Sequence, residues 1–284
     1  PYRVDVHRPA DVIEEVLRIL GFDRIALPER LECPPVREPR VTLEKVRAGT
    51  GMHLAARGFR EIMSPSLVNG AEAVRAGAIA EGHAVRLKNP LSAELDMLRP
   101  TLLFGGLQAI AHNQNRQMHD LRFFEHGRVY TVEKGVVRER ERTALWITGR
   151  RGRERWRSGK DMVDVFDLKA EIELLLERNG WPRAAVETAP HALLHEAVDL
   201  RVDGRSLAVV GEVSAPVVQA FGIQRPVFFA EIADDAWVDA LRAEHVEFQD
   251  VPRFPAVRRD LSVLLDEGVG FEQLEHLART AETR

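Results

Sequence analysis

The sequence has one cysteine, Cys33, among 284 residues, and it has no apolar run near the length of a membrane helix. A lone cysteine excludes a disulfide framework and a cysteine-rich zinc site, and it fits a reducing compartment. A membrane span needs about 18 consecutive apolar residues. The first residues are polar and charged rather than signal-like. We therefore expect a cytoplasmic protein with no membrane partner.

An excess of positive charge is also missing, because 40 Lys and Arg stand against 44 Asp and Glu, for a net charge of -4. Any contact with nucleic acid must therefore be local rather than spread over a basic surface. Hydrophobic residues make up 45% and charged residues 30%, which is typical of a globular protein. The length allows one large domain with attachments, or two domains.

The beginning of the sequence reads as a piece of a longer protein, since it opens at Pro1 on a strand-like segment, residues 2–6. Residues 9–20 place apolar side chains on one stripe, which predicts an amphipathic helix that ends at Gly21. Four prolines between residues 28 and 39 predict a linker.

Apolar periodicity predicts an α+β middle, in which an antiparallel sheet is covered by helices. After the first helix, further helices are expected at residues 41–56, 100–113, 167–180, 216–221, 235–243 and from about 271. After the first strand, further strands are expected at residues 61–68, 84–87, 122–131, 142–148, 198–202, 206–213, 227–232 and 261–265.

Local signals predict details of these elements. Residues 133–135 and the Asp203-Gly204 pair favour tight turns between neighbouring antiparallel strands. Asp167 is the expected N-cap of its helix. Two adjacent glycines, Gly105 and Gly106, weaken a helix by about 1 kcal/mol each relative to alanine, so we expect a packing or functional reason for them.

Three strings carry a resemblance to a known family, and they occur in that family's order: YRVDVHRPADVIEEVLRILGFDRI, then NPLSAELDMLRPTLLFGGLQAIAHNQNRQ with RFFEHGRVY, and finally RFPAVRRDLSVLL. Together they resemble the beta subunits of bacterial phenylalanyl-tRNA synthetase over nearly the whole chain, as a C-terminal fragment. The resemblance implies that residues 1–34 end a B5 module. It implies a catalytic-like class II synthetase core at 35–246 and the start of a ferredoxin-like anticodon-binding domain at 247–284.

The same resemblance implies a noncatalytic subunit of a ligase. Together with an alpha subunit it would form an α2β2 heterotetramer that attaches phenylalanine to tRNA(Phe) with ATP. ATP would be used by the holoenzyme and not bound by this chain alone. The family's editing domain would precede Pro1, so this fragment would not hydrolyse mischarged tRNA. The alternative, which fold alone leaves open, is a stand-alone RNA-binding or scaffold protein with a synthetase-like fold.

An acidic set near the start is the sharpest chemical feature: Asp5, Asp11, Glu14 and Glu15. The last three have i, i+3, i+4 spacing and share a helix face, and Asp5 could reach them from the preceding strand. Carboxylate oxygens suit Mg²⁺. Acidic residues in a first helical turn also favour the helix dipole without any metal. The resemblance implies Mg²⁺ ligands at a site shared with the alpha subunit.

The residue after Tyr130 bears on catalysis. In the family's catalytic subunit a similar Gly-Arg-Val-Tyr segment is followed by an arginine that helps hold ATP, whereas Thr131 stands here. Without that cation the charge on the α-phosphate loses a stabiliser, which predicts a catalytic fold with an inactive site and no catalytic residue. Glu125 and Arg128 could serve there, but alternating charges on a strand more often form a solvated or interface face.

Other polar clusters have open interpretations. Residues 150–160 carry six positive charges around Trp156, which is compatible with phosphate contacts and base stacking or with a solvated loop. Residues 112–117 end a helix and could meet a partner subunit or water. His112 and His119 are too far apart for a zinc pair on one helix face. No individual tRNA contact is assigned.

Overall fold

The computed structural model describes most of the chain: residues 3–26, 30, 33, 39–92, 94–152, 156, 160–181, 184–243, 250, 254–255 and 257–281. The chain forms two compact units, Pro1–Glu244 and His245–Arg284. No helix in the described ranges is both long and apolar enough to cross a membrane. The first unit contains a large sheet that positions the site considered below.

Seven strands form this sheet in the order β1-β4-β5-β9-β8-β7-β6. β1 runs parallel to β4, and every other neighbouring pair is antiparallel. Their bounds are β1 (Arg60–Glu61), β4 (Leu121–Glu133), β5 (Val136–Thr148), β6 (Ala185–Thr188), β7 (Leu194–Val202), β8 (Arg205–Val213) and β9 (Phe228–Ala233). A separate antiparallel pair joins β2 (Leu67–Val68) and β3 (Met97–Leu98). This mostly antiparallel sheet with helices confirms the α+β prediction.

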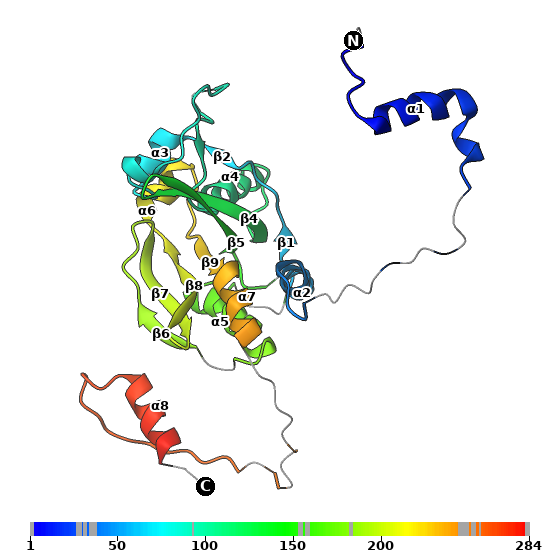
Figure 1. Cartoon of the computed structure of the whole chain (residues 1–284). Coiled ribbons are helices and arrows are strands. Elements are labelled where there is room, and N and C mark those ends of the chain that lie inside the picture. The colour runs from blue at the N-terminus through cyan, green and yellow to red at the C-terminus, as the bar shows by residue number, and fades with distance from the viewer. Residues whose placement is uncertain are drawn as a thin grey trace. The chain divides into compact units, whose positions relative to one another are not determined.

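Successive side chains of a strand point to opposite sides of a sheet. Both faces of this sheet carry buried apolar side chains, and helices cover both. Trp146 of β5 belongs to one apolar cluster and its neighbour Leu145 to the other. The cluster that contains Trp146 includes α3 (Gly70–Arg75), α4 (Leu103–Gln114) and α6 (Ala215–Ala220), and we call this side the α4 face. The opposite side, the α5 face, is covered by α2 (Leu43–Ala56), α5 (Val165–Arg178) and α7 (Asp234–Ala243), as Figure 1 shows.

Both expected hairpin turns are present. Lys134 and Gly135 connect β4 to β5 with φ values of 51° and 78°, and the strands pair along their whole length. Asp203 and Gly204 connect β7 to β8 with φ values of 50° and 74°. Two successive residues with positive φ give the turn whose twist matches paired strands, and glycine adopts such values without a steric penalty.

The two glycines of α4 have a packing role. A Cβ atom on Gly106 would lie 2.1 Å from Cε2 of the buried Trp146, and one on Gly105 would lie 2.1 Å from the Ser64 Oγ. Both distances are far shorter than van der Waals contact. The glycines therefore let α4 approach β5 and the segment after β1, as the sequence led us to expect.

The helix α5 begins about one turn earlier than the sequence predicts. Asp164, not Asp167, is the N-cap, and its carboxylate accepts the Asp167 N–H at 3.0 Å. The Asp167 carboxylate in turn accepts the Asp164 N–H at 2.9 Å. Such a reciprocal capping box can form because both positions carry a carboxylate. The prediction that Asp167 is the N-cap was therefore wrong, because Asp167 stands at the third helical position.

Four predicted strands differ from the structure. No strand forms over residues 3–6 or 261–265, and residues 84–87 make only an isolated bridge between Arg86 and Met97. The segment 61–68 divides between the end of β1 and β2. Apolar alternation alone does not make a strand, because its backbone groups also need a neighbouring strand. Residue 2 lies outside the described ranges.

Amphipathic helices flank the sheet in sequence, as predicted. α1 (Pro9–Leu20) precedes a 3-10 turn at Phe22–Arg24, and none of its residues is buried. In the second unit, α8 (Phe271–Thr280) begins where the sequence indicated. Most of the expected linker at 28–39 lies outside the described residues. The strands β3 and β6 and the helix α3 were not predicted.

An arginine of α2 connects that helix to the sheet. The Arg47 Nε donates to the buried Asp234 carboxylate at 2.8 Å, and its Nη2 donates to the carbonyls of Gly127 and Arg142. The Thr143 hydroxyl donates to the same carboxylate at 3.0 Å and lies 2.7 Å from the His126 Nδ1. Since the hydroxyl proton points to Asp234, the neutral histidine donates from Nδ1.

This network predicts a pH-dependent stability. Burial, together with the Arg47 charge, lowers the pKa of His126 from 6.5 to about 4. Between these pH values the unfolded chain takes up a proton that the folded chain rejects, so stability falls as the pH decreases. We expect this group to contribute a loss of up to roughly 3 kcal/mol between pH 7 and pH 4 in urea denaturation.

The variant His126→Gln isolates this contribution, because glutamine keeps a donor beside Thr143 but does not titrate. Burial raises the pKa of Asp234, which contributes in the opposite direction, yet this effect is common to both proteins. The variant should therefore show a shallower loss of stability between pH 6.5 and pH 4 than the unchanged protein. Equal pH profiles would contradict the assignment.

Candidate functional site

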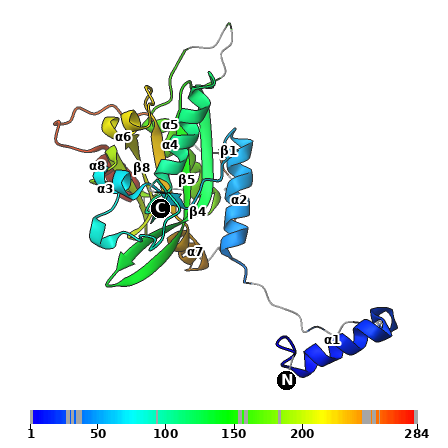
Figure 2. The same ribbon diagram turned by 90° about the horizontal axis from the view of Figure 1, so that it is seen from above.

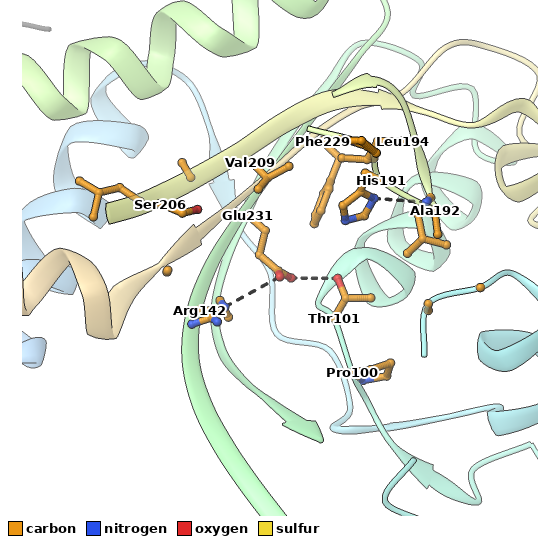
Figure 3. Close-up of a pocket in the computed structure, with 17 residues that line it drawn as sticks. Pro100, Thr101, Arg142, His191, Ala192, Leu194, Ser206, Val209, Phe229 and Glu231 are labelled. Atoms are coloured by element: carbon orange, nitrogen blue, oxygen red, sulfur yellow. Dashed lines mark hydrogen bonds and ion pairs between the residues drawn. The ribbon is translucent and has the colours of Figure 1, made fainter. Parts of the chain in front are cut away.

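A hollow of about 360 Å³ opens on the α4 face of the sheet (Figure 3). Its polar side chains include Glu231 of β9, Arg142 of β5 and Thr101, which precedes α4. The loop between β6 and β7 contributes His191, and β8 contributes Ser206, its second residue. Segments that are far apart in the chain thus meet at one place.

Glu231 is held by the start of α4. Its Oε1 accepts the Thr101 hydroxyl at 2.8 Å and the Leu102 N–H at 3.0 Å. The first N–H groups of a helix have no partner within the helix, so a carboxylate from the neighbouring strand satisfies one of them. This leaves the Oε2 atom of Glu231 to interact with other groups in the hollow.

Arg142 lies beside this carboxylate because β5 and β9 are neighbours. Ala144 stands opposite Glu231, so Arg142, two residues earlier on β5, projects from the same side of the sheet. Its Nε lies 4.0 Å from the Glu231 Oε2, beyond hydrogen-bond distance, and its Nη1 donates to the Glu141 carbonyl at 2.9 Å. The two side chains are only 19% and 21% exposed, so both charges are largely removed from water.

The remaining wall is mainly apolar. In Figure 3, Val209 lies beside Glu231, and Phe229 and Leu194 lie beside His191. The His191 Nδ1 accepts the Leu193 N–H at 3.2 Å, which leaves the proton of a neutral ring on Nε2. Loss of water around the ring lowers the pKa of His191, which favours this neutral form. The hollow therefore combines an apolar wall with an anion, a cation and a neutral donor.

The four predicted metal ligands lie elsewhere, in and before α1. Asp11 stands at the third helical position, and its Oδ2 accepts the N–H groups of His7 and of the N-cap Arg8 at 2.9 and 2.7 Å. These bonds lower the pKa of Asp11. Glu15 pairs with Arg18 at 2.7 Å, whereas Asp5 and Glu14 are exposed.

As placed, these four carboxylates do not come together in one group. The described residues contain no group of three or more His, Cys, Asp or Glu side chains that could hold a metal ion. Two of the predicted ligands, Asp11 and Glu15, already have cationic or backbone partners. The magnesium site therefore stays a prediction.

Glu125 does not lie on a solvated strand face, as the alternating charges had suggested. Its side chain is 2% exposed and pairs with Arg99 at 2.7 Å, and it accepts the Ser64 hydroxyl at 2.6 Å. The interpretation was wrong for Glu125 because Arg99 and Ser64, distant in sequence, supply its partners. Arg128 is half exposed and pairs with Glu141 at 2.8 Å.

The arginine-rich segment 150–160 is described only in part. Arg151 pairs with Asp164 at 3.2 Å and with Asp167 at 2.8 Å, the two carboxylates of the capping box of α5. Arg150 lies 3.9 Å from Asp120. Trp156 is exposed, and residues 153–155 and 157–159 lie outside the described ranges. The described arginines are thus engaged by carboxylates of the same chain.

Sequence reasoning missed the charged pair in the hollow. Glu231 interrupts the apolar string FFAEIA of β9 at a position that points to the covered α4 face, and this was the one local signal. A charge inside a covered strand requires a partner. The identity of that partner depends on the register between β5 and β9, which the sequence does not reveal.

The arrangement of strands and helices defines a class. Two solved structures of pyrrolysyl-tRNA synthetase from Desulfitobacterium hafniense resemble the chain, with TM-scores of 0.55 and 0.52. The matches cover 82% and 78% of this chain and 76% and 72% of those chains, at 15% sequence identity. The fold is therefore that of a synthetase-like domain.

Sequence comparison identifies the family. Residues 27–233 match the family model described as the phenylalanyl tRNA synthetase beta chain CLM domain, and the chain belongs to this family. Beta subunits of phenylalanine–tRNA ligase from Porphyromonas gingivalis and Bacteroides thetaiotaomicron are 35% and 33% identical over 100% of this chain. The one from Salinibacter ruber is 35% identical over 95%. The chain spans 35–36% of the length of these relatives.

Proposed function

We propose that this chain is part of a noncatalytic beta subunit of phenylalanine–tRNA ligase. It would support the ATP-dependent attachment of phenylalanine to tRNA(Phe) by an alpha subunit, through assembly and tRNA binding in the cytoplasm. The observation that carries the proposal is the family match over residues 27–233, together with relatives of that name along the whole chain. Nothing favours a stand-alone RNA-binding or scaffold role.

The surroundings of Thr131 support a noncatalytic role. The Thr131 hydroxyl accepts a hydrogen bond from the Arg140 Nη1 at 3.0 Å, and the same guanidinium pairs with Glu133. The guanidinium that contacts Thr131 is therefore already balanced by a carboxylate. A nucleotide phosphate would have to compete with Glu133, and we expect no ATP binding by this chain alone.

The exposed side of α2 supports assembly with another subunit. Ala48, Met52 and Ala55 have i, i+4, i+7 spacing and are exposed, whereas Leu54 on the other side is fully buried. Met52 is 69% exposed, and Met63, shortly after β1, is 95% exposed. Figure 2 shows α2 beside β1 at the edge of the sheet. Small residues and methionines suit close packing with a partner, and we propose that the alpha subunit contacts this side in an α2β2 heterotetramer.

The double variant Met52→Glu with Met63→Glu tests this surface in the full-length protein. Two charges in an apolar interface should weaken co-purification with the alpha subunit and reduce phenylalanylation by more than about tenfold. The thermal midpoint should stay unchanged, because both side chains are exposed. Phe166→Glu, a comparable exchange at an exposed position of α5, is the matched control. Unimpaired co-purification of the double variant would exclude this surface.

The flanking regions and the metal are separate proposals. The amphipathic helices α1 and α8 support a B5 end in residues 1–34 and a ferredoxin-like anticodon-binding start in 247–284 around the class II synthetase-like core at 35–246. For Mg²⁺, the support is the helical spacing of Asp11, Glu14 and Glu15, and any site would need ligands from the alpha subunit.

A magnesium titration tests the acidic set. The variant Asp11→Ala with Glu15→Ala should weaken subunit assembly or change its dependence on magnesium. Gel filtration of the full-length protein with the alpha subunit measures this assembly. Arg18 lies on the same helix and pairs with Glu15, so Arg18→Ala controls for loss of that ion pair. Unchanged assembly across the titration would remove the support for this site.

A further inference from the structure

The hollow on the α4 face presents two opposite charges whose bonding is incomplete within the described structure. Glu231 uses Oε1 for two hydrogen bonds, while its Oε2 has Arg142 at 4.0 Å. Arg142 reaches a second carboxylate, Asp235, only at 3.9 Å. A pair at such separation gains less than one in hydrogen-bond contact, and both groups have lost most of their water. A ligand that carries both signs of charge would complete the bonding of each.

The positions of the two charges are fixed by the sheet. Arg142 and Glu231 lie on paired strands, and the Glu231 Oε1 is held by the N-terminus of α4. A ligand would therefore meet a prepared arrangement and would not have to order these side chains. A volume of about 360 Å³ lies within the usual range for small-molecule sites, about 300–1,000 Å³.

A second, larger hollow of about 860 Å³ near the start of α5 contrasts with this one. Two of its arginines are paired at contact distance: Arg57 pairs with Glu171 at 2.9 Å, and Arg151 pairs with Asp167 at 2.8 Å. A phosphate there would have to displace these carboxylates. The charged pair on the α4 face requires no such displacement.

We propose that the hollow on the α4 face binds a free α-amino acid with an apolar side chain. The ammonium group lies against the Glu231 Oε2 and the carboxylate against Arg142, so that four charges of alternating sign lie at the corners of a quadrilateral. The side chain contacts Leu194, Val209 and Phe229. This site is independent of the subunit assembly proposed above.

Binding is measured with the full-length chain, purified without an alpha subunit, and with L-leucine as the probe in isothermal titration calorimetry. We expect half-saturation on the order of 1 mM for a ligand of this size. Leucinamide, which lacks the carboxylate, and N-acetylleucine, which lacks the ammonium group, should each bind at least about tenfold more weakly.

Two variants assign these preferences to the two side chains. Glu231→Gln keeps an acceptor for the Leu102 N–H but removes the charge, so leucine and N-acetylleucine should bind it equally weakly. Arg142→Gln should abolish the preference for leucine over leucinamide. Arg128→Gln, on the adjacent strand and half exposed, is the matched control and should bind as the unchanged protein does. If Glu231→Gln lowers the thermal midpoint, Arg142→Gln still tests whether the hollow binds the carboxylate of the amino acid.

Other amino-acid sites in the full-length protein do not affect this comparison, because only the difference between the variants and the unchanged protein is scored. The proposal is overturned if leucine does not bind at 20-fold above the expected half-saturation. Equal binding by both variants and the unchanged protein also overturns it. Tighter binding of uracil, a neutral molecule with amide groups, than of leucine would overturn it as well. Loss of assembly with an alpha subunit bears only on the proposed function.

Discussion

Replacing Arg99 with methionine should lower the free energy of unfolding by about 3–5 kcal/mol. The reason is that Arg99 and Glu125 form an ion pair at 2.7 Å, with only 5% and 2% of their side chains exposed. The Arg99 Nε also donates to the Arg128 carbonyl at 2.9 Å. Without the guanidinium, Glu125 keeps a buried charge whose remaining partners among the described contacts are the hydroxyl and the backbone N–H of Ser64. Urea denaturation of the full-length protein measures the loss.

A double-variant cycle separates the lost pair from the lost packing. Arg99→Met combined with Glu125→Leu removes both charges and should be more stable than Arg99→Met alone, because apolar replacements of a buried pair are often neutral. Arg128→Met serves as the exposed control and should cost at most about 1 kcal/mol. If Arg99→Met cost no more than this control, the buried pair would not have the assigned role.

Replacing Gly106 with valine should destabilise the fold by more than about 3 kcal/mol. The new Cβ would overlap the indole of Trp146, which is fully buried on the α4 face. Either α4 must move away from β5, or the indole must leave its position, and both changes disrupt the same apolar cluster. Thermal and urea unfolding both report the effect.

The matched control is Gly49→Ala in α2, where a Cβ would meet no atom within 4 Å. Alanine there should stabilise the protein by about 0.4–1 kcal/mol, since it restricts the unfolded chain. Trp146→Leu combined with Gly106→Val should cost less than the sum of the single changes, because the smaller side chain makes room. Strict additivity would show that the two residues do not share space.

Elements with strong local signals were predictable. The alternation in β4 and β5 and the turn at Lys134-Gly135 are sufficient for a hairpin, and the structure contains it. For α5, apolar spacing predicts the helix, although two carboxylates three residues apart made the cap ambiguous. Local sequence signals therefore predict the type of an element more reliably than the residue at which it begins.

The strand prediction for residues 261–265 was wrong for a reason that the sequence does not show. Its alternation resembles that of β4, yet a strand needs a neighbour for its backbone groups. β4 has such neighbours in β1 and β5, whereas no strand forms over 261–265. Apolar pattern is thus a necessary signal for these strands and not a sufficient one.

The candidate site was the least predictable feature. Arg142 and Glu231 are 89 positions apart, and they meet only because β9 inserts between β5 and β8 in this register. Likewise, Glu125 is buried because Arg99 and Ser64 fold over it. The acidic set at α1 was assigned from helical spacing together with the family resemblance, and the magnesium site stays a prediction. The charges of this set found backbone and arginine partners nearby.

The most direct test of the central proposal is an aminoacylation assay with full-length protein, alpha subunit and tRNA(Phe). The proposal predicts that phenylalanyl-tRNA forms only when both subunits are present, and that the full-length protein alone shows no phenylalanine-dependent exchange of pyrophosphate into ATP. Equal activity from the alpha subunit alone, or aminoacylation by the full-length protein alone, would contradict it.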